Sequence, residues 1–463
     1  MHRSPSFAEA AGDSRALSRS SPWPLIAVCV GYFMVILDTM VVNVALPAIS
    51  RGLHATTTGL EWVVDAYSLV FAATLLSGGA FGDRRGAKRV FQVGMAVFAL
   101  SSLGCGLSPT TGVLVIARCA QGLGAGLAVP ASLSLLQAAY HDQAARGRAL
   151  GIWGAVAGVA AATGPVVGGA LVSGLGWRSV FFLNVPIGGA GLLLAAWRLP
   201  APPRRPHGAD PSGQLAAVVS LVGLTAALIE AGAAGWTAPV VVTGFAVFVL
   251  AAAAFVAVEH RASRPMLPLS MFSSSTFSAA TVVGLLINLG FYGELFVMSL
   301  YLQQLRGMSA LRAGVALLPQ AAMAVIGSTA SGRVMARTGP RLPMVAGLLL
   351  GSAGLASLVV VGAHSSYGLL VAPFMATGLG MSLVMPAATA AVMEAAPPDR
   401  AGLASATVNA ARQVGGVIGV ALLGTLVAAR ATFLPGLRAG VLAAAGAFLL
   451  GAVLTARSVC DVA

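Results

Sequence analysis

Long apolar segments separated by short polar interruptions cover almost the whole chain after residue 23. Each segment is long enough for a helix to cross a bilayer core, which takes about 20 residues for roughly 30 Å. The apolar residues run continuously instead of alternating with polar ones, so helices are predicted and not the strands of a barrel. Fourteen spans are predicted, at approximately 24–47, 58–80, 89–107, 112–136, 148–173, 178–198, 213–233, 238–258, 276–303, 312–334, 342–362, 367–390, 403–429 and 437–457.

The composition strengthens this prediction. Charged residues make up 9% of the chain, hydrophobic residues make up 57%, and the mean hydropathy is +0.89. A soluble domain is about 25% charged, so most of the surface of this chain must face lipid. The net charge of +13 comes from Arg residues scattered among short loops, which is a signal of topology and not of a nucleic-acid surface. We therefore expect an all-α membrane protein with no nucleic-acid partner.

The Cys and His residues show no pattern typical of a disulfide framework or a metal site. Cys29, Cys105 and Cys119 lie inside apolar segments, and Cys460 lies in the C-terminal tail, without paired spacing. The six His residues fall in tails or loops. The chain also lacks the G-x-x-x-x-G-K-[ST] loop that holds nucleotide phosphates. We expect no metal, no cofactor and no enzymatic activity.

The distribution of basic residues predicts the orientation in the membrane. With the N-terminus inside, the inner segments hold 19 Lys and Arg residues and the outer loops hold 6. Cytoplasmic loops carry such an excess in membrane proteins. Residues 1–23 lack the apolar core of a signal peptide and are predicted to form a cytoplasmic tail. We expect a multi-pass protein of the cell membrane with both termini cytoplasmic.

The chain repeats itself over a distance of about 250 residues. Residues 114–136 align without gaps on residues 370–392, and both stretches contain Gly-Leu-Gly followed by Pro-Ala. A repeat of this kind indicates two homologous halves. The predicted division is an N-terminal six-helix bundle at 24–200, a linker with two accessory membrane helices at 201–272, and a C-terminal six-helix bundle at 273–463.

Six sequence motifs occur in order along the chain. They are LDTMVVNVALP (37–47), EWVVDAYSL (61–69), GAFGDRRGAKR (79–89), ARCAQGLGAG (117–126), GPVVGG (164–169) and WRSVFFLNVPIG (177–188). With these motifs the chain resembles the major facilitator superfamily and, within it, the fourteen-helix drug:H⁺ antiporter family of multidrug and antibiotic resistance exporters. The resemblance implies the major facilitator fold, with two pseudo-symmetric six-helix bundles plus two extra transmembrane helices.

The loop GAFGDRRGAKR matches the superfamily's cytoplasmic loop motif. By this resemblance, Gly82, Asp83, Arg84 and Gly86 are expected to form a cytoplasmic gate that latches the outward-open state. Glycine at two of these positions permits close packing and a tight turn. The alternative is a positively charged anchor without a gating role.

The motif GPVVGG matches the antiporter motif of the family. Gly164, Gly168 and Gly169 provide a smooth surface that lets a neighbouring helix approach, and Pro165 removes one backbone hydrogen bond. By resemblance, this segment is expected to be the hinge that favours export. The alternative is packing through glycine alone.

Ionisable residues inside predicted spans are the strongest functional signal, because charge within a membrane is costly. Counting residues along the spans places Asp38, Asp65, Arg118 and Glu294 about 9–14 Å from the outer boundary. Charges distant in sequence but equal in depth predict a shared cavity. A carboxyl group in such a cavity can carry a proton, whereas Arg cannot release one.

By resemblance, Arg118 matches the family Arg linked to proton transfer, and Asp38 matches the acidic residue of the first helix. Asp65, Arg118, Asp38 and Glu294 are the predicted proton-coupling and substrate residues. The alternative for each is a purely structural pair. Further candidates that line the cavity are Asn43, Gln121, Tyr292 and Arg412.

The sequence thus predicts a proton-coupled efflux antiporter that exports small organic compounds by alternating access. We expect a lipophilic or cationic substrate, protons and the lipid bilayer as its partners, and no obligate protein partner is evident. One alternative is a dedicated exporter of a single endogenous metabolite or self-made antibiotic. The other is a membrane sensor or scaffold that transports nothing, against which the embedded acids at one depth argue.

Overall fold

A computed structural model describes residues 22–140, 142–199, 211–262, 267, 269–396, 401–428 and 433–459. In the first part of the chain the helices are α2 (Trp23–Leu53), α3 (Thr57–Arg85), α4 (Ala87–Leu107), α5 (Thr111–Ala139), α6 (Gln143–Leu175), α7 (Ser179–Phe182) and α8 (Asn184–Arg198). Two further helices follow, α9 (Pro211–Ala234) and α10 (Pro239–Arg261). The last part contains α11 (Ser275–Leu300), α12 (Ala310–Ala316), α13 (Leu318–Thr338), α14 (Arg341–Ser357), α15 (Gly368–Ala395), α16 (Ala401–Ala428) and α17 (Phe433–Ser458), with short 3₁₀ or π segments at Leu269–Ser273, Tyr301–Leu305 and Leu358–Val360.

The predicted all-α fold with fourteen spans is confirmed. Within the described residues, thirteen helical segments are long and apolar enough to cross a membrane, counting α7 with α8 and α12 with α13 as one span each. Helix α3 is the remaining long helix, and it carries Glu61 and Asp65 in its first half and Asp83, Arg84 and Arg85 at its end. The predicted boundaries agree with the observed helices to within about six residues, the largest difference being at the end of α2.

Local sequence signals set the ends of the helices that carry the site. Thr56 caps α3 by accepting from the Gly59 amide, and Thr110 caps α5 by accepting from the Val113 amide. Gly86 separates α3 from α4 with a φ of 96°, a conformation that favours glycine. These caps and turns keep the interhelix loops short, so neighbouring spans pack as antiparallel pairs.

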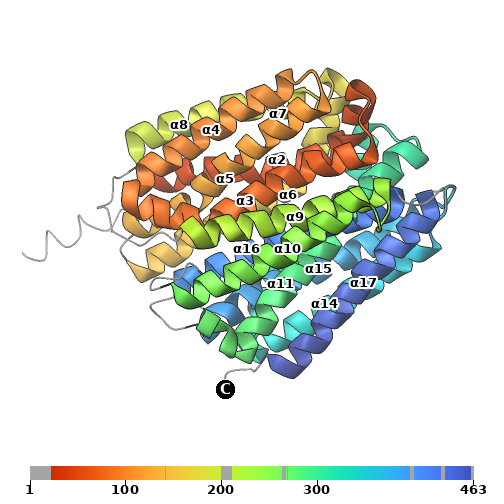
Figure 1. The fold of residues 1–463 in the computed structure, drawn as a ribbon. Helices are drawn as coiled ribbons and strands as arrows, with labels where there is room; N and C mark the ends of the chain where they lie inside the picture. Colours follow the sequence, from red (N-terminus) through yellow and green to blue (C-terminus); the bar gives the residue numbers. More distant parts are fainter. Residues whose placement is uncertain are drawn as a thin grey trace, which may run out of the picture.

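The spans assemble into two bundles (Figure 1). In the first half, α2 packs on α6 and α8, and α5 packs on α3 and α4. In the second half, α11 packs on α16 and α17, and α15 packs on α13 and α14. Helices α9 and α10 pack on each other, and α9 covers the seam where α3 meets α16.

Both ends of the described chain lie at one end of the molecule, which we call the termini end, and the opposite end is the far end. Helix α17 finishes beside the start of α11, where Thr276 Oγ1 donates to the Ser458 carbonyl at 3.1 Å. Helix α11 in turn runs parallel to α2, because Ser299 near its end bonds Asn43 in the last third of α2.

The two halves touch at the far end. Among the described residues, three hydrogen bonds join them: Ser299 Oγ to the Asn43 carbonyl at 2.6 Å, Gln303 Nε2 to the Val44 carbonyl at 2.9 Å, and the Leu311 amide to Ser173 Oγ at 3.1 Å. In the termini-end half of α6, a Cβ added at Gly151, Gly154 or Gly158 would meet nothing within 4 Å. The hydrogen bonds close the two halves against each other at the far end.

The glycines of GPVVGG face two different helices. A Cβ on Gly164 would overlap the Met40 side chain, and one on Gly168 would lie 2.9 Å from the Val41 Cα, both on α2. Gly169 instead faces the other half, where a Cβ would lie 2.6 Å from the Ala310 carbonyl oxygen on α12. The close helix packing expected of this motif is therefore present, with α6 held between α2 and α12. Its role as a hinge, together with Pro165, stays a prediction.

The predicted gate residues lie at the termini end, between α3 and α4. Gly86 adopts the expected turn, Gly82 is buried and Arg84 is exposed. The side chain of Asp83 lies outside the described residues. The gating role of this loop stays a prediction.

The contact between α6 and α12 generates a test. A Cβ on Gly314 would overlap the Pro165 carbonyl, whereas one on Gly332 of α13 would meet nothing within 4 Å. We expect Gly314→Ala to open the far end, because α12 must move away from α6. Spin labels placed on the far ends of α6 and α12 should show a longer distance in Gly314→Ala. The control variant Gly332→Ala should show the same distance as the parent chain. An unchanged distance in Gly314→Ala would show that the contact between α6 and α12 does not close the far end.

Candidate functional site

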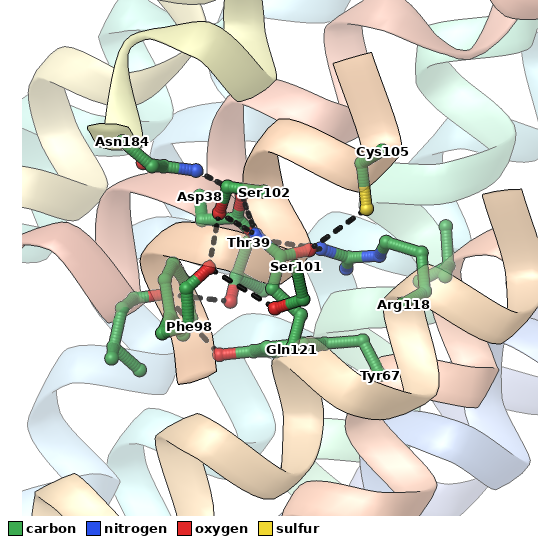
Figure 2. A network of polar contacts seen from close by, with 12 residues as sticks. Asp38, Thr39, Tyr67, Phe98, Ser101, Ser102, Cys105, Arg118, Gln121 and Asn184 are labelled. Atoms are coloured by element: carbon green, nitrogen blue, oxygen red, sulfur yellow. Dashed lines mark hydrogen bonds and ion pairs between the residues drawn. The ribbon is translucent and has the colours of Figure 1, made fainter. Parts of the chain in front are cut away.

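An ion pair between Asp38 of α2 and Arg118 of α5 lies at the centre of the first half (Figure 2). Arg118 Nη1 approaches Asp38 Oδ2 to 2.5 Å. Asp38 is 0% exposed and Arg118 is 1% exposed. Of the four charged residues predicted to share one cavity, these two are in direct contact.

Neutral side chains from the surrounding helices complete the hydrogen bonding of the pair (Figure 2). Gln121 Nε2 donates to Asp38 Oδ1 at 2.9 Å and lies 2.7 Å from Ser102 Oγ on α4. Asn184 Nδ2, at the start of α8, donates to the same Asp38 oxygen at 2.7 Å. Arg118 Nη1 also donates to Gln121 Oε1 at 2.8 Å. Asp38 of α2 thus accepts hydrogen bonds from both α5 and α8.

Helix α3 supplies the remaining contacts of the guanidinium group. Arg118 Nε donates to the Val63 carbonyl at 3.0 Å, and the guanidinium carbon lies 4.3 Å from the centre of the Tyr67 ring. A cation over an aromatic face is stabilised by the ring quadrupole. Helices α2, α3, α4, α5 and α8 therefore all contribute, and the second half contributes nothing to this network among the described residues.

Asp65 is not part of this network. It is 0% exposed, and neither of its carboxyl oxygens has a hydrogen-bond partner. Glu61, one turn earlier on α3, is equally buried and equally without partners, and its carboxyl group lies against Gly424 of α16. No hydrogen bond or ion pair joins Asp65 to Asp38 or Arg118. These two acids form a separate buried site at the seam between the halves.

Glu294 lies in the second half, in a site of its own. It is 1% exposed, and its oxygens bond Gln320 Nε2 of α13 at 3.1 Å and Thr377 Oγ1 of α15 at 3.2 Å. No basic side chain pairs with it within the described residues. In this conformation the four residues do not share one cavity. They lie in three separate buried sites.

The internal repeat relates the first and third of these sites. The offset of 256 residues that aligns 114–136 with 370–392 also pairs Asp38 with Glu294, and it pairs Gln121 with Thr377. Each half therefore places a carboxyl group on its first helix and a hydrogen-bonding partner on its fourth. Arg118 corresponds to Phe374, so the second half lacks the cation.

The four candidates for cavity lining separate into two groups. Gln121 belongs to the ion-pair network, and Asn43 is buried at the far-end contact, where its Nδ2 donates to the Thr39 carbonyl at 2.8 Å. Tyr292 and Arg412 are only half-buried, and they belong to α11 and α16, which pack on each other. Tyr292 packs over Gly416, one turn of α16 beyond Arg412.

Comparison with known proteins agrees with the two-bundle arrangement and the motifs that build its site. The family model described as Major Facilitator Superfamily matches residues 28–420 and 321–459. The chain belongs to the Major Facilitator Superfamily.

Within this superfamily, the chain is similar to named resistance proteins. It is 38% identical to the methylenomycin A resistance protein of Streptomyces coelicolor, over 92% of this chain and 90% of that one. It is 40% identical to the tetracenomycin C resistance and export protein of Streptomyces glaucescens, over 89% and 77% of the two chains. Among solved structures, a peptide transporter crystallised with sulfate has a TM-score of 0.71 at 16% identity, over 94% of each chain, which is a likeness of fold.

Sequence reasoning about this superfamily member missed several residues of the sites. Asn184, Ser102 and Gln320 were not predicted, although each makes a hydrogen bond to a key residue or its partner. Asn184 and Gln320 are single amides within apolar segments, and a polar side chain in a membrane helix is itself a signal. Ser102 offers no such signal, because small hydroxyl residues are common in packed membrane helices. The described residues contain no group of three His, Cys, Asp or Glu that could hold a metal.

The buried pair generates a thermodynamic test. Removing one partner of a buried ion pair leaves an uncompensated charge and costs about 3–5 kcal/mol, whereas removing both costs far less. We expect Asp38→Asn and Arg118→Met each to lower the free energy of unfolding by about that amount. The double variant should cost less than the sum, as measured by equilibrium unfolding in mixed micelles. Strictly additive costs would show that the pair contributes no coupling energy.

Proposed function

We propose that this protein is a proton-coupled efflux antiporter that exports small organic compounds across the cell membrane by alternating access. The observation that carries the proposal is the Asp38–Arg118 ion pair, enclosed within one half of a two-bundle transporter fold. The names of the relatives support export, since one is called a methylenomycin A resistance protein and another a tetracenomycin C resistance and export protein.

The ion pair supplies the coupling chemistry. A proton that binds Asp38 neutralises the carboxylate and removes the charge attraction to Arg118. The guanidinium group then keeps its bonds to the Val63 carbonyl and the Tyr67 ring on α3, while α2 is released from α5. Loss of the proton to water at the cytoplasmic side restores the pair. Arg118 acts as a fixed cation in this cycle, because it does not give up its own proton.

Asp65 and Glu294 are proposed as further proton carriers. Both are buried carboxyl groups without a basic partner among the described residues, and burying an ionised carboxylate in that setting is costly. Asp65 and Glu61 lie where α3 meets α16, a contact that changes when one half moves on the other. Glu294 occupies the position in the second half that Asp38 occupies in the first.

The halves are proposed to act as the two moving domains. The excess of basic residues supports a cytoplasmic termini end, so the conformation closed at the far end is inward-facing. In the outward-facing state, the contact of Gly169 and Gly314 between α6 and α12 opens, and the loop with Gly82, Asp83, Arg84 and Gly86 closes the cytoplasmic side. Pro165 lies at this contact and is the proposed hinge.

Asp38→Asn tests the coupling. The variant cannot release a proton, so uptake of radiolabelled tetracenomycin C into inverted vesicles driven by a pH gradient should fall by about tenfold or more, as expected for the loss of a charge-assisted hydrogen bond. Exchange of labelled for unlabelled compound without a gradient should persist and shows that the variant is folded. Glu394→Gln, which removes an exposed acid of α15, is the matched control. Gradient-driven uptake at the parent rate in Asp38→Asn would refute the coupling role.

A cysteine-labelling experiment tests the orientation. Ser366 is exposed in the far-end turn before α15, and Cys460 lies in the C-terminal tail. In intact cells, a membrane-impermeant maleimide should label the introduced thiol of a Ser366→Cys, Cys460→Ser variant and should not label Cys460 in the parent chain. In inverted vesicles, Cys460 of the parent chain should be labelled, and the introduced thiol of the Ser366→Cys, Cys460→Ser variant should not. Labelling of Cys460 in intact cells would place the termini outside.

A further inference from the structure

Arg412 of α16 differs from Arg118 in having no acidic partner within the described residues. Its Nη1 donates to Asn409 Oδ1 at 3.1 Å, and its Nη2 lies 3.5 Å from the Met385 sulfur on α15. A thioether is a weak acceptor, and Arg412 Nε has no partner at all. A membrane-embedded cation with so little compensation is costly to maintain, which indicates a function.

The surroundings of Arg412 come from both halves. Arg412 lies near Tyr32 on α2 and Tyr292 on α11, and the Tyr292 ring packs over Gly416, one turn further along α16. The Tyr32 ring stacks on Trp153 of α6, with ring centres 3.7 Å apart and planes inclined by 6°. Arg412, Tyr32, Tyr292 and Trp153 are all half-buried, as expected for side chains that face the space between the bundles.

The polar groups at this place are mostly donors. Arg412 Nε and Trp153 Nε1 are both buried without a hydrogen-bond partner, on opposite halves of the molecule. Unsatisfied buried donors are rare in folded proteins and call for an explanation. A ligand that brings acceptor oxygens would satisfy both donors and would also place its ring beside the Tyr32–Trp153 stack.

The acids that would attract a cationic ligand are engaged elsewhere. Asp38 is bound to Arg118, Glu294 is bound to Gln320, Glu61 lies against Gly424 of α16, and Asp65 is fully buried one turn from Glu61. Among the described residues, no carboxyl group forms an ion pair with Arg412. The local charge at this place is therefore positive.

We infer that Arg412, Tyr32, Trp153 and Tyr292 form the substrate site of the exporter, and that this site selects organic anions that carry a flat ring. The inference rests on the proposed export function and names its substrate class. It differs from the lipophilic or cationic substrate that the sequence suggested, because the aromatic residues here surround an Arg. Arg412 binds the carboxylate or another anionic group, and the rings hold the conjugated body of the compound.

Three isosteric probes test the charge preference: 2-naphthoate, 2-naphthamide and 2-naphthylmethylammonium. Their equilibrium binding to the purified full chain in phosphatidylcholine nanodiscs would be measured by scintillation proximity, with no pH gradient present. We expect 2-naphthoate to bind about tenfold or more tightly than 2-naphthylmethylammonium, as one charge-assisted hydrogen bond implies. Equal binding of the two, or no binding of 2-naphthoate up to about 1 mM, would overturn the inference.

Two variants assign the preference to Arg412. Arg412→Gln should weaken 2-naphthoate binding by about tenfold and leave 2-naphthamide binding within about twofold, which also shows that the variant is folded. Arg312→Gln removes an exposed Arg of α12 in the same half and should behave as the parent chain. Equal 2-naphthoate binding in the two variants would overturn the role of Arg412.

These measurements separate the inference from the proposed function. If Asp38→Asn retained gradient-driven uptake while the parent chain preferred 2-naphthoate, proton coupling through Asp38 would be wrong and the anion site would stand. If coupling were observed and the parent chain bound the ammonium probe as tightly as 2-naphthoate, the anion site would be wrong.

Discussion

The low dielectric of the membrane interior makes the Asp38–Arg118 pair the interaction on which the first half depends. Either charge alone would be costly there, and the pair is stable because other groups complete its hydrogen bonds. Gln121, Asn184 and the Val63 carbonyl do so, and they belong to different helices. One ion pair thereby fixes how α2, α3, α5 and α8 pack. A change in its protonation is felt by all of them, which is what an ion-driven conformational cycle requires.

The two halves of the internal repeat share the helix positions of their polar side chains but differ in charge. The helix positions of Asp38 and Gln121 recur as Glu294 and Thr377, but Phe374 stands where Arg118 would be. The second half therefore holds its carboxyl group with neutral donors alone. A carboxyl group paired with an Arg and one held by neutral side chains respond differently to the same proton. This difference gives the two halves distinct chemistry on one scaffold.

The sequence predicted the number, length and order of the spans because each needs only a run of apolar residues. It also placed Asp38 and Arg118 at one depth, and they are in contact. Depth in the membrane did not separate Asp65 and Glu294 from this pair, because depth says nothing about the direction in which a side chain points from its helix. Asp65 lies one turn from Glu61, whose carboxyl group lies against Gly424 of α16, and Glu294 faces the core of its own half. Packing between helices decides that direction, and a single sequence does not record it.

The lone positive charge of Arg412 has an electrical consequence. An organic anion that leaves the cell and a proton that enters both carry positive charge inward. One of each per cycle therefore moves two charges down a membrane potential that is negative inside. At about 100 mV this amounts to roughly 5 kcal/mol per cycle, at about 2.3 kcal/mol for each charge. A cation exchanged for one proton would move no net charge and would gain nothing from the potential. If Arg412 selects an anionic substrate as inferred, export is powered by voltage as well as by pH.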